Sequence, residues 1–193
     1  MNTLTVKVII GSTRQNRFSD SPARWIAERA AMRPDMDVEV LDLREYPMPF
    51  YDEPVSPSMV KDGAYANPIV QRWAAKIAEA DAFIIVTPEY NRGPSAVLKN
   101  ALDQIYAEWN RKAVAFVAHG SSLGSRAIEQ LRTNAIELQM APIRAAVQMP
   151  WSGTLRDEHG ELLPGAFDPF AKAADGMLDQ LAWWASALKT ARS

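Results

Sequence analysis

The chain has 193 residues and a net charge of −2, and its composition is 48% hydrophobic and 23% charged, as in ordinary globular proteins. It contains no cysteine, which excludes a disulfide framework, an iron–sulfur cluster, a thiolate zinc site and a cysteine nucleophile. Its 21 basic and 23 acidic residues form no basic block, and no apolar run reaches the ~20 residues of a membrane span, so neither nucleic acid nor a membrane is an expected partner. Residues 1–193 are therefore predicted to form a single domain that binds a small molecule.

The first ten residues, MNTLTVKVII, lack the basic region, long apolar stretch and cleavage site of a secretory signal. They are typical of a strand, and a cytoplasmic location is expected. Further short apolar runs alternate with helical patterns along the chain. The five predicted strands are residues 5–10, 38–43, 82–87, 113–119 and 143–149. Alternating strands and helices predict an α/β fold with a parallel sheet covered by helices on both faces.

Capping residues mark where three of the helices are expected to begin. Ser21-Pro22 and Asn67-Pro68 each place a capping side chain before a proline, and Ser95 precedes the helical run AVLKNALDQIY. A last helix is expected over residues 168–192. Its core-facing side is predicted to carry Leu178, Leu181, Trp184, Ala185 and Leu188.

Two segments are too long to be simple connections between these elements. Residues 44–66 hold four of the 13 prolines, and residues 151–169 contain several glycine and proline turn signals. Both are expected to be surface excursions near the functional site or at a subunit contact.

The expected architecture is a doubly wound five-stranded sheet of order 2-1-3-4-5. Ligands of such a sheet bind outside the carboxyl ends of the strands, where the chain reverses direction. That geometry selects the loops after the first, third and fourth strands. They are residues 11–21, 88–94 and 120–124, and all three are rich in glycine, hydroxyl or amide groups.

The opening loop, GSTRQNRFSDS, has the chemistry of a phosphate site. Ser12, Thr13, Ser19 and Ser21 supply hydroxyl donors, and Arg14 and Arg17 add charge-assisted hydrogen bonds close to a helix N-terminus. The loop matches neither G-x-G-x-x-G nor the P-loop pattern, so a phosphate monoester is the expected ligand. The alternative is a solvated, self-capped loop with surface arginines.

The second loop, PEYNRGP, is suited to a planar ligand. Pro88 fixes the backbone, Tyr90 offers a flat amphipathic ring, and backbone N–H groups there can face a ring system. The alternative is a turn with an exposed tyrosine.

Three motifs together carry a resemblance. GSTRQNRFS, TPEYNRGPSAVLKNALDQ and AHGSSLGSRAIEQLR resemble the NADPH-dependent FMN reductase family of flavodoxin-like proteins, over residues 6–148. The resemblance implies a flavodoxin-like fold with bound FMN. By this resemblance, the phosphate and ribityl end would be held by Ser12, Arg14, Arg17 and Ser19. The isoalloxazine ring would be lined by Pro88, Glu89, Tyr90 and Asn91, and its far side closed by Gly120, Ser121 and Gly124.

The resemblance also implies an enzyme in which the bound cofactor performs the hard step, so that no catalytic side chain and no metal are expected. Hydride would pass from NADPH or NADH through FMN to a quinone, an azo dye, free flavin or a metal oxyanion.

Two rival functions remain open. The third loop, GSSLG, also matches the G-x-S-x-G nucleophile elbow of a serine hydrolase, with Ser122 as nucleophile. Asp157 and His159 would complete its triad, but they lie unusually close together in sequence. A flavin-binding electron carrier without turnover is the second rival, because fold alone does not assign a reaction.

A homodimer or a dimer of dimers is expected, with each flavin near the subunit interface. The helix after PEYN is predicted to continue into DQIYAEWN, where Ile105, Tyr106 and Trp109 would form an exposed apolar patch. The alternative is that Tyr106 and Trp109 pack beneath residues 151–169 of the same chain.

Overall fold

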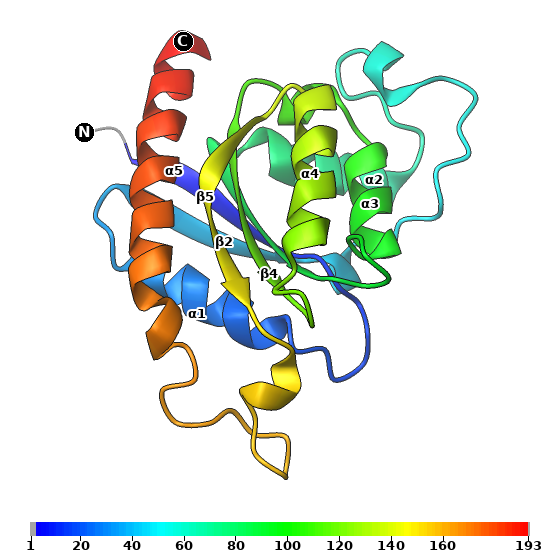
Figure 1. The fold of residues 1–193 in the computed structure, drawn as a ribbon. Coiled ribbons are helices and arrows are strands. Elements are labelled where there is room, and N and C mark those ends of the chain that lie inside the picture. The colour runs from blue at the N-terminus through cyan, green and yellow to red at the C-terminus, as the bar shows by residue number, and fades with distance from the viewer. Residues whose placement is uncertain (1–2, 193) are drawn as a thin grey trace.

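The structure, a computed structural model, describes residues 3–192 and contains one parallel sheet of five strands in the order β2-β1-β3-β4-β5 (Figure 1). The strands are β1 (Leu4–Ile10), β2 (Met36–Asp42), β3 (Ala82–Pro88), β4 (Ala113–His119) and β5 (Ala141–Met149). In the centre of the sheet, Val8 of β1 pairs with Val40 of β2 on one side and Ile84 of β3 on the other. The predicted sheet and its strand order are confirmed.

Helices cover both faces of the sheet, as Figure 1 shows. One face carries α1 (Asp20–Ala31) and α5 (Ala171–Arg192), and the other carries α2 (Pro68–Ala78), α3 (Ala96–Asp103) and α4 (Ser125–Glu137). None of these helices combines the length and the apolar character that crossing a membrane requires.

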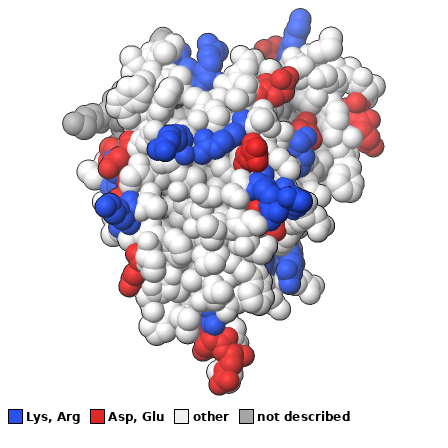
Figure 2. Space-filling model, in the orientation of Figure 1, with Lys and Arg blue, Asp and Glu red and all other residues white. Residues whose placement is uncertain are grey.

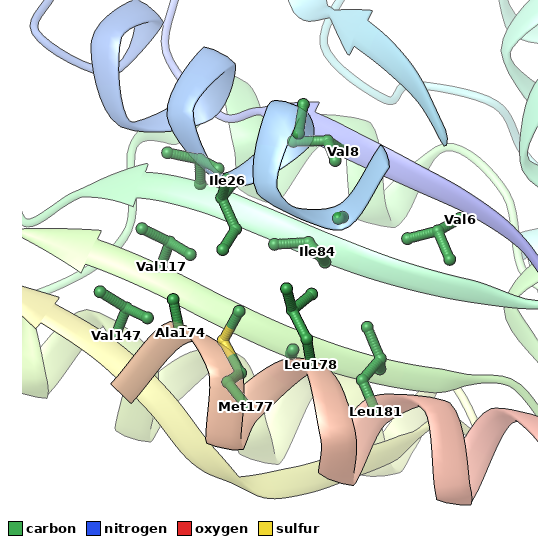
Figure 3. Packing of buried hydrophobic residues seen from close by; sticks show 14 of the residues in the cluster. Val6, Val8, Ile26, Ile84, Val117, Val147, Ala174, Met177, Leu178 and Leu181 are labelled. Atoms are coloured by element: carbon green, nitrogen blue, oxygen red, sulfur yellow. The ribbon is translucent and has the colours of Figure 1, made fainter. Parts of the chain in front are cut away.

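The core has two halves because the side chains of each central strand alternate between the two faces. Figure 3 shows the half beneath α1 and α5, where Val8, Ile84 and Val117 meet Ile26 of α1 and Leu178 of α5. The other half is rich in aromatic rings.

Trp109 lies at the centre of the aromatic half of the core. Its ring centroid is 4.9 Å from that of Phe83 and 5.9 Å from that of Trp73, and the side chain is fully buried. Ile105 is buried in the same cluster, and Tyr106 packs against it from the edge. The predicted exposed patch therefore does not exist, and the alternative of packing under residues 151–169 is also wrong.

The reason for this difference is that α3 ends at Asp103 and does not continue through Trp109. The chain makes a short 3-10 helix over Ala107–Trp109, which carries Trp109 into the core. Burying an indole ring contributes more than the added helical turn would.

Two of the three predicted caps are confirmed. Asn67 Oδ1 accepts a hydrogen bond from Ile69 N at 2.8 Å, and Ser95 Oγ accepts one from Leu98 N at 3.2 Å. The prediction for Ser21 is wrong, because α1 already begins at Asp20 and Ser19 precedes it without a capping hydrogen bond.

The excursions and the last helix depart from the expected pattern only locally. Residues 44–66 dock onto α3, where Asn100 Nδ2 donates to Pro49 O at 2.9 Å and Gln104 Nε2 donates to the same oxygen at 2.7 Å.

In α5 the predicted core position of Trp184 is wrong. This ring is 39% exposed and packs edge-on against Trp183, outside the core.

Candidate functional site

The loops after β1, β3 and β4 meet at the carboxyl edge of the sheet and are joined by hydrogen bonds. Ser12 Oγ lies 3.3 Å from Tyr90 Oη, which links the opening loop to the second loop. Glu89 N donates to His119 O at 2.8 Å, which links the second loop to the end of β4. The three loops that the sequence selected therefore form one continuous surface.

Arg17 is buried inside the opening loop and paired with carboxylates. Its Nη1 donates to Asp42 Oδ1 at 2.7 Å and its Nε to Asp20 Oδ1 at 2.7 Å, and a further bond reaches Ser12 O. Burial is the largest single influence and acts to raise the pKa of Asp42, but the hydrogen bonds and positive charges of Arg17 and Arg44 together outweigh it and hold that pKa below its ordinary value. Arg17 therefore fixes the loop to the end of β2, and its charge is already balanced.

Ser12 and Ser19 are the buried serines of the opening loop, each only 1% exposed. Besides the contact of Ser12 with Tyr90, Ser19 Oγ lies 3.0 Å from Nε2 of His119. Both hydroxyls are thus engaged inside the protein.

Arg14 is the exposed cation of the loop. Its backbone takes part in hydrogen bonds with Ser12 and Arg44, whereas its guanidinium has no hydrogen bond or ion pair with any residue between 3 and 192. Beside it, the backbone N–H groups of Gln15, Asn16 and Arg17 have no acceptor within the same described range. A free cation next to a run of free amides is a typical cradle for an anion.

The second loop is a tight turn that presents Tyr90. Tyr90 and Gly93 exchange backbone hydrogen bonds of 2.9 and 3.0 Å across Asn91 and Arg92, whose φ angles are +48° and +72°. Two successive positive φ angles define a type I′ turn, in which asparagine is favoured. The ring of Tyr90 remains 36% exposed beside the opening loop.

Glu89 turns away from this surface. Its carboxylate is buried and accepts hydrogen bonds from Nε of Arg126 at 2.7 Å and from the Arg126 backbone N at 3.1 Å. Glu89 therefore holds the start of α4 against the second loop.

The third loop needs its glycines. A Cβ on Gly124, where φ is +71°, would lie 2.5 Å from Ala118 Cβ and 2.8 Å from His119 N. A Cβ on Gly120 would lie 3.0 Å from Glu89 Cβ. The backbone N–H groups of Ser121 and Ser122 have no acceptor in the described part of the chain. The loop thus packs closely on β4 while presenting free donors.

Sequence reasoning missed His119 as a part of the site. Burial, with a smaller effect of the nearby positive charge of Arg156, lowers the pKa of His119 to about 4. Strand alternation was an available signal, because His119 follows Ala115 and Val117 on the face of β4 that α1 covers, and Ser19 stands where α1 begins.

The side chains of the serine hydrolase hypothesis are not brought together. Ser122 Oγ accepts a hydrogen bond from Arg126, and His159 is exposed next to Glu158 on the excursion after β5. Neither His119 nor His159 bonds to Ser122 among the interactions of the described residues.

In residues 3–192 no three His, Asp or Glu side chains gather in a group that could hold a metal ion. Basic and acidic side chains are interspersed on the face that Figure 2 shows.

Comparison with known proteins identifies the family of the chain. Residues 4–152 match the model of the NADPH-dependent FMN reductase family. The chain belongs to this family. The predicted resemblance is confirmed, and with it the assignment as an FMN-dependent oxidoreductase.

Individual FMN reductases and related enzymes align over most of the chain. An NAD(P)H-dependent FMN reductase of Schizosaccharomyces pombe is 37% identical over 166 residues, which is 85% of this chain and 78% of that protein. A quinone reductase of Pseudomonas putida is 29% identical over 183 residues, covering 86% and 92% of the two chains. A solved flavoenzyme NAD(P)H:(acceptor) oxidoreductase from Paracoccus denitrificans, 22% identical, superposes with a TM-score of 0.72 over 96% and 98% of the two chains, which shows the same flavodoxin-like fold.

The residues present fit the family's cofactor. FMN has one phosphate, and the opening loop offers one free cation with three free amides. Tyr90 offers a flat ring, and the amides of Ser121 and Ser122 are donors for a ring that gains negative charge on reduction. No second phosphate-binding motif follows, in agreement with a mononucleotide.

Proposed function

We propose that this FMN reductase uses NADPH or NADH to reduce a small acceptor of the quinone type, with azo compounds, free flavin and metal oxyanions as further acceptors. The observation that supports this most is the convergence of the free cation, the free amides and the exposed Tyr90 ring on one edge of the sheet. The P. putida relative is named a quinone reductase, which supports the acceptor class. Residues 1–193 act as one FMN-binding domain in this proposal.

The proposed site uses all the residues that the sequence selected, in two roles. Arg14, Tyr90, Asn91, Ser121 and the loop amides contact the cofactor directly. The other positions give the three loops their shape from below; they are Ser12, Arg17, Ser19, Pro88, Glu89, Gly120 and Gly124.

Bound FMN supplies hydride transfer between a nicotinamide and the acceptor. The chain binds and orients it: Arg14 neutralises the phosphate, and Tyr90 flanks the ring system. The amides of Ser121 and Ser122 donate toward the ring edge where negative charge develops, and fixed donors of this kind stabilise such charge without reorganising.

The proposed function is tested on the purified, flavin-reconstituted protein. Anaerobic NADPH is expected to bleach its yellow colour, a quinone to restore it, and denaturation to release FMN. Release of FAD alone, or a colour that neither NADPH nor NADH changes, would contradict the proposal, and bleaching without reoxidation by any acceptor would favour the electron carrier.

Replacing Arg14 by alanine is expected to weaken FMN binding by about 1.5–3 kcal/mol, because one charge-assisted hydrogen bond to the phosphate is lost. The exposed side chain has no partner among the described residues, so the melting temperature should stay unchanged. Fluorescence titration measures the affinity, and riboflavin, which lacks the phosphate, is the matched control ligand. An equal loss for both flavins would place the phosphate elsewhere.

Replacing Ser122 by alanine is expected to leave NADPH oxidation within about twofold of the wild type. The change keeps the backbone amide, and among residues 3–192 the hydroxyl that it removes bonds only to Arg126. Steady-state NADPH consumption with a quinone measures this. An ester hydrolase activity in the wild type that disappears in the variant would establish the hydrolase instead.

We propose a homodimer, or a dimer of dimers, through residues 44–66. Phe50 is 78% and Met59 70% exposed there, and both line an apolar hollow of about 490 Å³. Light scattering is expected to give twice the 21.4 kDa chain mass or a higher multiple, and Phe50→Asp/Met59→Asp to reduce it to the mass of one chain. A wild type that stays at 21.4 kDa at micromolar concentration refutes this.

Because NAD(P)H is held inside cells, we place the enzyme in the cytoplasm.

A further inference from the structure

His119 is the last residue of β4 and makes a buried contact with the opening loop. Its Nε2 lies 3.0 Å from Ser19 Oγ, across 100 residues of sequence. The imidazole ring also meets Phe18 edge-on, with ring centroids 4.9 Å apart. One side chain therefore touches the two residues that end the opening loop.

The imidazole of His119 is neutral near pH 7, because burial lowers its pKa to about 4. A neutral ring carries one N–H, so Nε2 is able either to donate to the Ser19 hydroxyl or to accept from it. The hydrogen bond is thus available over the whole physiological pH range, and its strength does not depend on a charge.

This bond fixes one end of the phosphate cradle. The cradle amides belong to Gln15, Asn16 and Arg17, immediately before Phe18 and Ser19. At the other end, Gly11 N donates to Val86 O at 2.8 Å. Between these two contacts, Arg17 ties the loop to Asp42 at the end of β2. The free amides are thus held by a backbone anchor on β3, an ion pair to β2 and a side-chain anchor on β4, and the last of these fixes the end of the loop where α1 begins.

We propose that His119 is a positioning residue that gives this FMN reductase its preference for FMN over unphosphorylated riboflavin. Through Ser19 it holds the opening loop in the shape that receives the phosphate. This inference rests on the proposed placement of the phosphate at that loop. Since His119 acts on the phosphate cradle, its loss affects a flavin that carries a phosphate and spares one that does not.

The test measures the affinity of the apoprotein for FMN and for riboflavin by flavin fluorescence in five variants and the wild type. His119→Phe keeps a flat ring against Phe18 but removes the nitrogen, His119→Gln restores an N–H donor, and Ser19→Ala removes the hydroxyl. Arg14→Ala reports independently where the phosphate lies, and the fifth variant combines His119→Phe with Ser19→Ala. Thermal melts confirm that each variant is folded.

His119→Phe and Ser19→Ala are each expected to weaken FMN binding about tenfold, the size of one lost hydrogen bond, and to change riboflavin binding less than twofold. The double variant should be no weaker than either single variant, because both remove the same bond. His119→Gln should recover most of the FMN affinity. Ser19→Ala alone still decides the matter if the phenylalanine variant does not fold.

Three results would overturn the inference. If Arg14→Ala lowers the FMN-to-riboflavin preference but His119→Phe and Ser19→Ala do not, the phosphate lies at the loop and His119 does not position it. If none of the three changes the preference, the proposed phosphate site itself is wrong. Additive losses in the double variant would likewise show that the two side chains act separately.

Discussion

Replacing Arg17 by methionine is expected to destabilise the fold by about 3 kcal/mol, since removing one partner of a buried ion pair leaves the other charge uncompensated. The side chain of Arg17 is almost fully buried, whereas that of Asp42 is 23% exposed. The expected loss of unfolding free energy therefore lies at the lower end of the range for broken buried ion pairs. Methionine retains most of the apolar stem of the side chain and removes the charged guanidinium. Urea denaturation measures the change, and FMN binding should weaken with it because the opening loop loses its attachment to β2.

Arg29→Met is the matched control. Arg29 pairs with the well-exposed Asp175 at 2.7 Å, so its loss should cost at most about 1 kcal/mol. The pKa of Asp42 is lowered in the folded chain, so its stabilising contribution is present above its ordinary pKa and is lost as the pH falls through the lowered value. The gap between the wild type and Arg17→Met should therefore narrow in acid. Equal losses for the two arginines would contradict the assignment of Arg17 as a buried anchor.

Replacing Gly124 by alanine is expected to cost about 3–5 kcal/mol, which combines a backbone conformation that alanine disfavours with a direct clash. The new Cβ would lie 2.5 Å from Ala118 Cβ and 2.8 Å from His119 N, and neither atom can move without displacing β4. The same displacement would disturb the contact of His119 with Ser19. Retention of FMN after gel filtration and the midpoint of urea denaturation measure the two effects.

Gly160→Ala separates the clash from the backbone strain. Gly160 also has a positive φ, +82°, but nothing lies within 4 Å of its added Cβ. The expected loss is only about 1 kcal/mol, from the backbone conformation alone. If alanine at Gly124 lowers the free energy of unfolding no more than alanine at Gly160 does, the third loop can adjust to the new Cβ and does not depend on close packing.

The topology was predictable from sequence because it depends on a repeated pattern. Five apolar runs alternate with helices, and parallel strands must then place the loops that follow them at one edge of the sheet. The end of α3 was not predictable in the same way. Ile105 and Trp109 have helical spacing, but spacing does not say whether the chain continues as a helix or bends to bury an indole.

The loops of the site were found from sequence, but their internal partners were not. Arg17 has the charge and the N–H donors of a phosphate ligand. Asp42, at the end of β2 and 25 residues away, pairs with it instead. Glu89 is paired in the same way with Arg126. Residue types show what a loop can bind, whereas the neighbours that occupy those groups depend on strand order and register.

The C-terminal helix α5 has a consequence for the order in which the chain folds during synthesis. Ala174, Met177, Leu178 and Leu181 cover one face of β1, β3 and β4, although those strands are made 50 or more residues earlier. Lys189 and Arg192 then bond to Asp81, just before β3. A nascent polypeptide that stops before residue 171 therefore leaves an apolar strand surface uncovered, and such surfaces associate with one another. A chain truncated before residue 171 and released from the ribosome should therefore aggregate or be retained by chaperones, whereas the chain that includes all of α5 should not.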